Sequence, residues 1–278
     1  NIIINMKYYL NSIFYLCLYY MSIKSTLNNT NHVSKNKYKK ENSFLRSTMS
    51  KFMGYGKNEN KITFYGNKYK TDKIFQHHYD EYYDMYINKF YNREGSMIEI
   101  GVEKGKSLQM WLKVFEKAHI YGADIGMKYS GKRHDVFQVD QSSEVELDGF
   151  IDVINKDNIM FIIDDGSHIP EHQLLTFNKL FPLLIEGGVY IIEDIETSYW
   201  TKQGLYGYKT RYGYKHKKSI IEIFKDIVDV VNKEFVKHNI VTPVNHLSSI
   251  HSITFGRNCI IINKRKISDR VYRFKKYL

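Results

Sequence analysis

The sequence has few of the residues that hold small secreted folds or fibrous chains together. It contains 2 cysteines, Cys17 and Cys259, near opposite ends of the chain, and neither lies in a CxxC pair. They offer no disulfide framework and no zinc pattern, which favours a reducing compartment. With 3 prolines and 17 glycines in 278 residues, the chain is neither a linker nor a collagen-like repeat. We expect a folded, cytoplasmic protein.

The N-terminal region lacks a hydrophobic run of full membrane-spanning length. Residues 6–22 are mostly apolar or tyrosine but short for a span, so a membrane anchor is one alternative there and an artefactual leader is the other. Residues 24–60 are rich in Lys, Asn and Ser, a composition typical of flexible chain. We therefore expect a low-complexity leader over residues 1–60 and one folded domain over residues 61–278.

Acidic residues are scarce at both ends and abundant in the middle. The formal net charge is +11, and the balance of Lys and Arg against Asp and Glu is about +10 over residues 1–73, about −11 over residues 74–200 and about +12 over residues 201–278. Such flanks indicate a solvated lysine-rich surface more than a site for nucleic acid or an anionic membrane. We therefore do not expect a nucleic-acid partner.

A strand, a glycine turn and a helix predict a nucleoside site. Residues 97–100 are apolar, and the helix after them has apolar residues at i, i+3, i+4 and i+7. Between them, Gly101 and Gly105 would let the backbone approach a ligand closely. The segment EIGVEKGKS is not GxGxxG, so a nucleoside without a pyrophosphate fits better than a dinucleotide.

Two further strands end in acids that suit the same ligand. The second strand ends in Asp124, 19 residues after Gly105, where an acid can bond to ribose hydroxyls. The third ends in Asp140 and Gln141, where a side chain could accept a bond from an adenine amino group. A helix cap and a surface acid would explain each feature alone, but together they favour a nucleoside ligand.

The stretch from residue 162 to residue 200 gathers carboxylates at one edge of the expected sheet. Apolar runs at residues 160–163 and 189–192 each end in two acids, and the carboxyl ends of parallel strands meet at one edge. The crowded side chains are Asp164, Asp165, His168, Glu193 and Asp194. Like charges and burial both oppose ionisation, so a bound cation or a proton-transfer role would explain them. Ordinary capping and strand-end solvation are the alternative.

Strands and helices alternate along the chain, which predicts a doubly wound α/β sheet with right-handed crossovers. Runs at residues 252–255 and 259–263 predict a terminal antiparallel hairpin. We expect a Rossmann-like sheet of about seven strands with helices on both faces.

Other segments carry weaker local signals. We interpret residues 61–73 as a strand or loop, residues 75–91 as a helix whose aromatic stripe packs in the core, residues 201–216 as a loop or lid, and residues 218–238 as one long amphipathic helix.

Five motifs together resemble a known family: EIGVEKGKS, IYGADI, FQVDQSS, IIDDGSHIPEHQ and GGVYIIEDIETSYW. They are similar to the macrolide sugar O-methyltransferases, such as the mycinamicin and macrocin enzymes, which have the class I S-adenosylmethionine-dependent methyltransferase fold. The resemblance covers roughly residues 61–266, and DDGSH with IEDIETSYW is its most specific part. It implies S-adenosylmethionine and Mg²⁺ as cofactors, with a sugar hydroxyl of a glycan or glycosylated small molecule as acceptor.

The resemblance also implies roles for single residues. Asp165, Glu193 and Asp194 match magnesium ligands, and His168 matches the general base. A hard cation bound by oxygen lowers the pKa of a sugar hydroxyl, and histidine can accept a proton near neutral pH. The candidate cofactor residues, which include a TDK segment found near the cofactor in relatives, are Glu99, Gly101, Gly105, Ser107, Asp124, Asp140, Gln141, Asp72 and Lys73.

Three aromatic residues near the acids are candidates for the substrate site. Tyr199 and Trp200 can line a sugar pocket or pack in the core, and His172 can support His168 or simply lie on a helix face. The macrolide enzymes have a substantial N-terminal domain that helps build the substrate site, whereas this chain has a short leader there. The acceptor and a homo-oligomeric assembly therefore stay open.

Three functions remain as hypotheses. The first is a magnesium-dependent sugar O-methyltransferase. The second is a ribose O-methyltransferase on nucleic acid, which the basic flanks favour, although no lysine stands in the acidic cluster to act as base. The third is a non-catalytic binding module with the same fold, against which the intact acids and His168 count.

Overall fold

The computed structural model describes residues 60–200, 210–236 and 239–266. The expected leader and its candidate anchor at residues 6–22 lie outside this part, and so does most of the expected loop at residues 201–216. The division into leader and folded domain stays a prediction. Among the described residues, no helix combines the length and the apolar character that a bilayer crossing requires.

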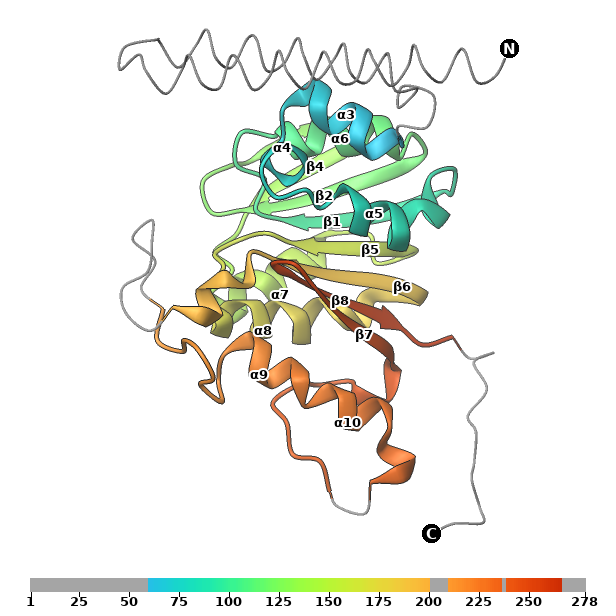
Figure 1. Cartoon of the computed structure of the whole chain (residues 1–278). Coiled ribbons are helices and arrows are strands. Elements are labelled where there is room, and N and C mark those ends of the chain that lie inside the picture. Colours follow the sequence, from blue (N-terminus) through green and yellow to red (C-terminus); the bar gives the residue numbers. More distant parts are fainter. Residues whose placement is uncertain (1–59, 201–209, 237–238, 267–278) are drawn as a thin grey trace, which may run out of the picture. The chain divides into compact units, whose positions relative to one another are not determined.

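One sheet of eight strands runs through the described part of the chain (Figure 1). The strands are β1 (Gly95–Ile100), β2 (Ala118–Asp124), β3 (Tyr129–Gly131), β4 (His134–Gln138), β5 (Ile159–Asp164), β6 (Leu184–Glu193), β7 (Ile250–Gly256) and β8 (Cys259–Lys264). Their order across the sheet is β3-β4-β2-β1-β5-β6-β8-β7. The neighbours among β4, β2, β1, β5 and β6 pair in parallel, and the pairs with β3, β7 and β8 are antiparallel. The predicted doubly wound sheet and its terminal hairpin are confirmed.

Helices cover both faces of this sheet (Figure 1). They are α3 (Lys61–Tyr69), α4 (Asp72–Phe75), α5 (Asp80–Ile87), α6 (Lys106–Val114), α7 (Glu144–Val153), α8 (Pro170–Leu180), α9 (Ile220–Lys225) and α10 (Ile227–Val231). Buried side chains of α3 to α6 belong to one apolar cluster, and those of α7 to α10 belong to another. The two groups of helices therefore pack on opposite faces.

Strand β5 shows why the central strands are apolar throughout. Every residue of β5 is buried. Phe161 packs in the cluster that contains Trp111 of α6, and Ile162 packs in the cluster that contains Phe177 of α8. Successive side chains of a strand point to opposite faces, so a parallel strand covered on both sides needs apolar residues at every position.

The helix starts follow signals in the sequence. Pro170 occupies the first turn of α8, where its missing N–H costs no hydrogen bond. The side chains of Ser143 and Ser219 cap α7 and α9 by accepting bonds from the backbone N–H groups of Glu146 and Glu222.

The prediction of a strand or loop at residues 61–73 is wrong. Residues 61–69 form α3, because Asn60 caps its first turn through Thr63 N–H and because Ile62 is fully buried against the α6 side of the core. The helix expected at residues 75–91 is shorter than predicted. Only α5, residues 80–87, is α-helical within this range beyond the last residue of α4.

The helix expected at residues 218–238 is also not continuous. It breaks into α9 and α10 at Asp226. Val228 and Phe235, which a single amphipathic helix over these residues would bury, are 47% and 56% exposed. The short edge strand β3 brings the sheet to eight strands rather than about seven.

Candidate functional site

The acids of the central stretch meet where β5 and β6 end. These strands pair in parallel with Asp164 opposite Ile192, so Asp165 and Glu193 follow at the same edge of the sheet. Both strands are buried along their ends, whereas the side chains of Asp165 and Asp194 are 21% and 14% exposed. The predicted convergence of carboxylates at this edge is therefore present in the structure.

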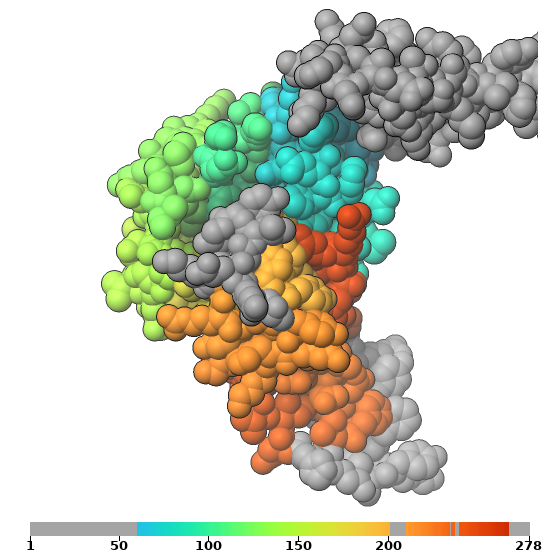
Figure 2. All heavy atoms as spheres, turned by 60° about the vertical axis from the view of Figure 1, so that its left-hand side comes forward, coloured from blue at the N-terminus to red at the C-terminus, as the bar shows by residue number. Residues whose placement is uncertain are grey.

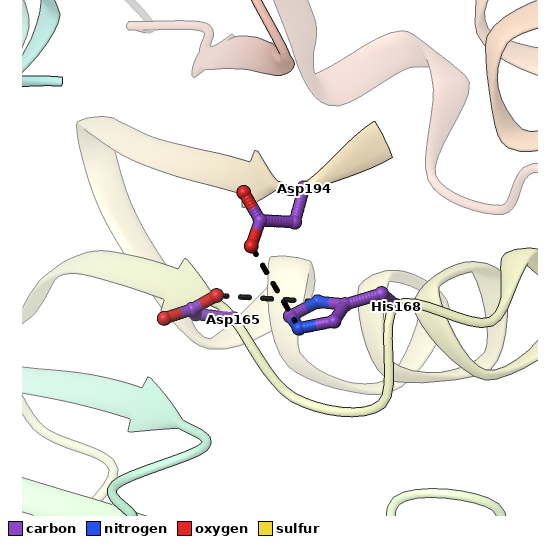
Figure 3. A group of neighbouring side chains, drawn as sticks. All are labelled: Asp165, His168 and Asp194. Carbon is purple, nitrogen blue, oxygen red and sulfur yellow. Dashed lines mark ion pairs between the residues drawn. The ribbon is translucent and has the colours of Figure 1, made fainter. Parts of the chain in front are cut away.

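His168 lies between two of these carboxylates (Figure 3). Its Nδ1 is 3.9 Å from Oδ1 of Asp165, and its Nε2 is 3.8 Å from Oδ2 of Asp194. The backbone of His168 is left-handed, with φ at +57°, and the Thr197 hydroxyl donates to its carbonyl oxygen. One ligand atom from each of Asp165, His168 and Asp194 lies within 4.8 Å of the others, so these three can hold a metal ion.

Asp194 is held by groups from distant segments. Its backbone is also left-handed, with φ at +50°. The Tyr79 hydroxyl donates to Oδ1 over 2.6 Å, and the side-chain amide of Asn258 donates to the same oxygen over 2.9 Å. The other oxygen, Oδ2, faces His168. This arrangement orients Asp194 toward the candidate metal position.

Glu193 lies behind this group and is engaged by other residues. Its side chain is 1% exposed. Lys73 donates to Oε2 over 2.8 Å, and the Tyr83 hydroxyl donates to Oε1. The assignment of Glu193 as a metal ligand stays a prediction.

Lys73, predicted near the cofactor, has its ammonium among the acids. Lys73 stands 92 positions before Asp165 in the sequence, yet its ammonium bonds to Oδ2 of Asp165 and to Glu193. The same Nζ lies 3.8 Å from Oε1 of Glu99. Burial alone would lower its pKa, but the charges of Asp165, Glu193 and Glu99 outweigh burial and raise the pKa well above its ordinary value. The expectation that no lysine stands in the acidic cluster is therefore wrong.

Two tyrosines of the aromatic stripe before β1 both pack in the core and reach the acids. Tyr79 and Tyr83 are buried in the core, as expected, but their hydroxyls bond to Asp194 and Glu193. Helical spacing predicts which face a side chain occupies, and it does not show what its polar end meets. Burial and the neighbouring carboxylates raise the pKa of both tyrosines, which therefore act as donors.

The segment that carries these tyrosines packs beside the terminal hairpin (Figure 2). The Tyr82 hydroxyl accepts a bond from the backbone N–H of Arg257, and Tyr86 pairs with Thr254 at 2.8 Å. Both contacts join α5 to the β7–β8 hairpin, so the two ends of the folded chain together support the acids.

The glycine turn after β1 is tied to the end of β2. The Asp124 carboxylate accepts bonds from the backbone N–H groups of Val102 and Glu103, at 2.9 and 2.8 Å. Gly101 has φ at +83°, and a Cβ there would lie 2.0 Å from the carbonyl oxygen of Asp165. The turn is therefore packed against the start of the acid loop, and the close approach of its backbone to a ligand stays a prediction.

Both carboxylate oxygens of Asp164 accept hydrogen bonds from buried side chains. Gln141 donates from Nε2 to Asp164 over 2.7 Å and accepts at Oε1 from the N–H of Ser167. The Tyr190 hydroxyl donates to the other oxygen of Asp164. Burial raises the pKa of Asp164 to about 7. Asp164 and Gln141 therefore hold the loop that carries Asp165 and His168.

Glu99, the residue before the last one of β1, lies beside the same acids. The indole N–H of Trp111 donates to its Oε1 over 2.9 Å, and Ser107 also bonds to it. Its side chain is fully buried, and burial raises its pKa to about 7. Its Oε2 accepts no bond from the described residues, so it is a buried acceptor beside the glycine turn.

A cavity of about 400 Å³ opens beside Asp140. It adjoins the ends of β2 and β4, where the sequence placed a nucleoside base. The lining residues are Ile125, Lys128, Phe137, Gln138, Asp140 and Glu146. Ile125 and Phe137 are the apolar members of this lining, and the other four residues are polar or charged.

The remaining predicted residues lie at the margins. Asp72 is exposed, and its carboxylate accepts from the N–H of Lys73. Tyr199 is 52% exposed and stacks on Tyr214, while Trp200 is half-buried. His172 bonds through Nδ1 to the Ser167 hydroxyl at 2.9 Å, which links it to the acid loop. Their substrate roles stay predictions.

The donor set suits a hard cation. Carboxylate oxygens from Asp165 and Asp194 face a common point with His168, and Glu193 is adjacent. Mg²⁺ prefers one or two carboxylates with water or substrate oxygens in its other positions. These residues therefore fit the magnesium ion that the resemblance implies.

Comparisons with known proteins agree with the motifs. No family model matches the chain. It is 36% identical over 165 residues to a rhamnosyl tetracenomycin-C 2'-O-methyltransferase of Streptomyces olivaceus, covering 56% of this chain and 43% of that protein. It is 33% identical over 165 residues to the mycinamicin VI 2''-O-methyltransferase of Micromonospora griseorubida, covering 56% of this chain and 41% of that protein. The chain thus spans less than half the length of these relatives.

A solved structure gives the same result. The MycE methyltransferase of the mycinamycin biosynthetic pathway, solved in complex with Mg and SAH, superposes with a TM-score of 0.65 and 26% identity, over 76% of this chain and 56% of that one. The predicted resemblance to macrolide sugar O-methyltransferases and the class I methyltransferase fold are confirmed.

Proposed function

We propose that this protein is an S-adenosylmethionine- and magnesium-dependent O-methyltransferase that acts on a sugar hydroxyl of a glycan or a glycosylated small molecule. The observation that carries the proposal is the group Asp165, His168 and Asp194 at the carboxyl edge of a methyltransferase sheet. The similar proteins support it, because their names describe methyl transfer to sugars of macrolide and tetracenomycin compounds. The proposed location is the cytoplasm.

The cofactor would occupy the crevice between the glycine turn and the cavity. Gly101 would let the cofactor approach the backbone of the turn closely. Asp124 keeps the turn in place by accepting bonds from two of its backbone N–H groups. The base would enter the cavity lined by Ile125 and Phe137, with Asp140 at its edge. Ligands bind at this edge of doubly wound sheets as a rule.

The chemistry at the acceptor needs a proton acceptor and a fixed oxygen. Bound S-adenosylmethionine would supply the methyl group, and bound Mg²⁺ would lower the pKa of the acceptor hydroxyl. His168 takes the hydroxyl proton on its imidazole ring. Asp194, whose Oδ2 is 3.8 Å from Nε2, stabilises the imidazolium that forms. Asp165 and Asp194 hold the cation position, and Glu193 supports it from the interior.

A second candidate is a ribose O-methyltransferase on nucleic acid, because Lys73 lies among the acids. A lysine base must lose its proton, but Asp165 and Glu193 raise the pKa of Lys73 well above its ordinary value. Lys73 is therefore a charge partner for the acids, and the sugar proposal is favoured.

A methyl-transfer screen tests the proposal. Labelled S-adenosylmethionine is incubated with sugar nucleotides, glycosylated small molecules, glycans and RNA, with magnesium or with chelator. Magnesium-dependent label in a sugar-bearing acceptor other than RNA is the expected result. Label in RNA alone would favour the ribose candidate, and binding of the cofactor without transfer to any acceptor would favour a non-catalytic module.

A further inference from the structure

A buried ammonium group lies among the acids to which the proposed function assigns the metal. The Lys73 side chain is 3% exposed. Its Nζ bonds to Asp165 and, over 2.8 Å, to Glu193, and it lies 3.8 Å from Glu99. Three carboxylates therefore surround one ammonium. A buried cluster of like charges is costly without a counter-charge, so the ammonium stabilises the acids as they stand.

The ammonium and a divalent cation would compete for the same carboxylates. Lys73 bonds to Oδ2 of Asp165 and Oε2 of Glu193. The Tyr83 hydroxyl already occupies Oε1 of Glu193. If Asp165, Glu193 and Asp194 all bind one cation, that cation competes at Glu193 with Lys73 for Oε2 or with Tyr83 for Oε1.

The chemistry of lysine makes it the donor that can leave. Its ammonium is a compact charge on a flexible four-carbon stem, and its backbone is fixed separately, because Lys73 N–H bonds to Asp72 over 3.0 Å within α4. Tyr83 is a rigid side chain buried within the core. The Lys73 head can therefore move while α4 stays in place.

We propose that Lys73 is a built-in counter-cation of the metal site: its ammonium holds Asp165 and Glu193 together when no divalent ion is bound, and it gives up Glu193 when one binds. This inference rests on the metal requirement of the proposed function. It makes Lys73 a positioning residue that competes with the metal, so it sets the affinity of the site for divalent ions.

The test is a calorimetric titration of the protein with Mg²⁺ alone. Lys73→Met removes the competing charge, and we expect it to bind Mg²⁺ at least about tenfold more tightly than the wild-type protein. Lys73→Arg keeps the charge and should bind Mg²⁺ no more tightly than the wild type. Lys179→Met is the matched control, because Lys179 also pairs with two carboxylates, Glu144 and Asp148, on the surface of α7 and α8; its affinity should equal that of the wild type.

Thermal unfolding supplies a second reading of the same samples. Without metal, Lys73→Met should unfold at a lower temperature than the wild type, and added Mg²⁺ should raise its midpoint by a larger amount. A Lys73→Met protein that binds Mg²⁺ equally or more weakly would overturn the inference. Absence of Mg²⁺ binding in the wild type and in Lys73→Met alike would instead overturn the metal requirement itself.

A measurement on the wild type covers the case in which Lys73→Met does not fold. The ¹⁵N resonance of the Lys73 ammonium is assigned by its loss in Lys73→Arg. Addition of Mg²⁺ should shift this resonance, since the ammonium leaves Glu193. A resonance that stays in place while Mg²⁺ binds would contradict the proposed displacement.

Discussion

The Tyr79 hydroxyl donates a hydrogen bond of 2.6 Å to Asp194, a residue 115 positions further along the chain. Tyr79 precedes the first strand, and Asp194 follows the sixth. Lys73 and Tyr83 reach Glu193 from the same N-terminal segment. The acids of the candidate site are therefore held from outside the sheet that carries them.

Tyr79→Phe should weaken Mg²⁺ binding by about ten- to one-hundredfold, because the lost donor leaves Asp194 less well oriented. Calorimetric titration measures the change. Tyr86→Phe is the matched control, since it removes a similar hydroxyl from α5, the helix that follows Tyr79, and this hydroxyl bonds to Thr254 rather than to an acid. Equal Mg²⁺ affinities in the two variants would show that the Tyr79 bond does not position the site.

The base assignment can be tested without straining the backbone. His168 has φ at +57°, a region that asparagine tolerates better than alanine. His168→Asn should lower the rate of methyl transfer by about 10²- to 10⁴-fold and leave cofactor affinity within about threefold of the wild type. Single-turnover kinetics and calorimetry measure the two quantities. Near-normal turnover in the variant would remove His168 from the role of base.

Burial of Asp164 predicts a dependence of stability on pH. Its pKa rises from 3.8 to about 7, so the folded state binds a proton that the unfolded state has released. The stabilisation is complete below about pH 4 and is lost as the pH rises through 7, by at most about 1.4 kcal/mol per pH unit. Glu99 has a pKa of about 7 with the same direction.

Asp164→Asn isolates the contribution of Asp164 from that of Glu99. Between pH 5 and pH 8, the free energy of unfolding of the wild type should fall relative to that of the variant, whose amide does not ionise. Urea unfolding at four pH values measures the difference. Parallel curves for the two proteins would show that Asp164 does not titrate in this range.

The strands and the acids could be predicted from the sequence, because short apolar runs ending in Gly or Asp carry the signal locally. The helix α3 could not, since KITFYGNKY has strand-forming residues and becomes helical through the Asn60 cap and the burial of Ile62. The sequence predicts Lys73 near the cofactor and Tyr79 in the core. Their bonds to Glu193 and Asp194 depend on tertiary packing. Sequence spacing has no signal for such long-range contacts.

Replacing Gly101 in the turn after β1 should destabilise the protein, and Gly149 serves as the control position. Gly101→Ala would place a Cβ 2.0 Å from the carbonyl oxygen of Asp165 at φ +83°, and it should cost about 3 kcal/mol or more of folding free energy. Gly149→Ala, in helix α7 with open space around it, should stabilise the protein by about 0.5 to 1 kcal/mol. Denaturant unfolding measures both. A Gly101→Ala protein as stable as the wild type would contradict the close approach of the turn to the acid loop.

The acids and His168 are proposed to form a magnesium-dependent site for methyl transfer to a sugar hydroxyl. The most direct measurement is transfer of labelled methyl from S-adenosylmethionine to glycosylated small molecules and glycans, with magnesium, with chelator, and with magnesium restored after chelation. Transfer is expected with magnesium, should be lost in chelator and should recover when magnesium returns. Full transfer in the presence of chelator would contradict it.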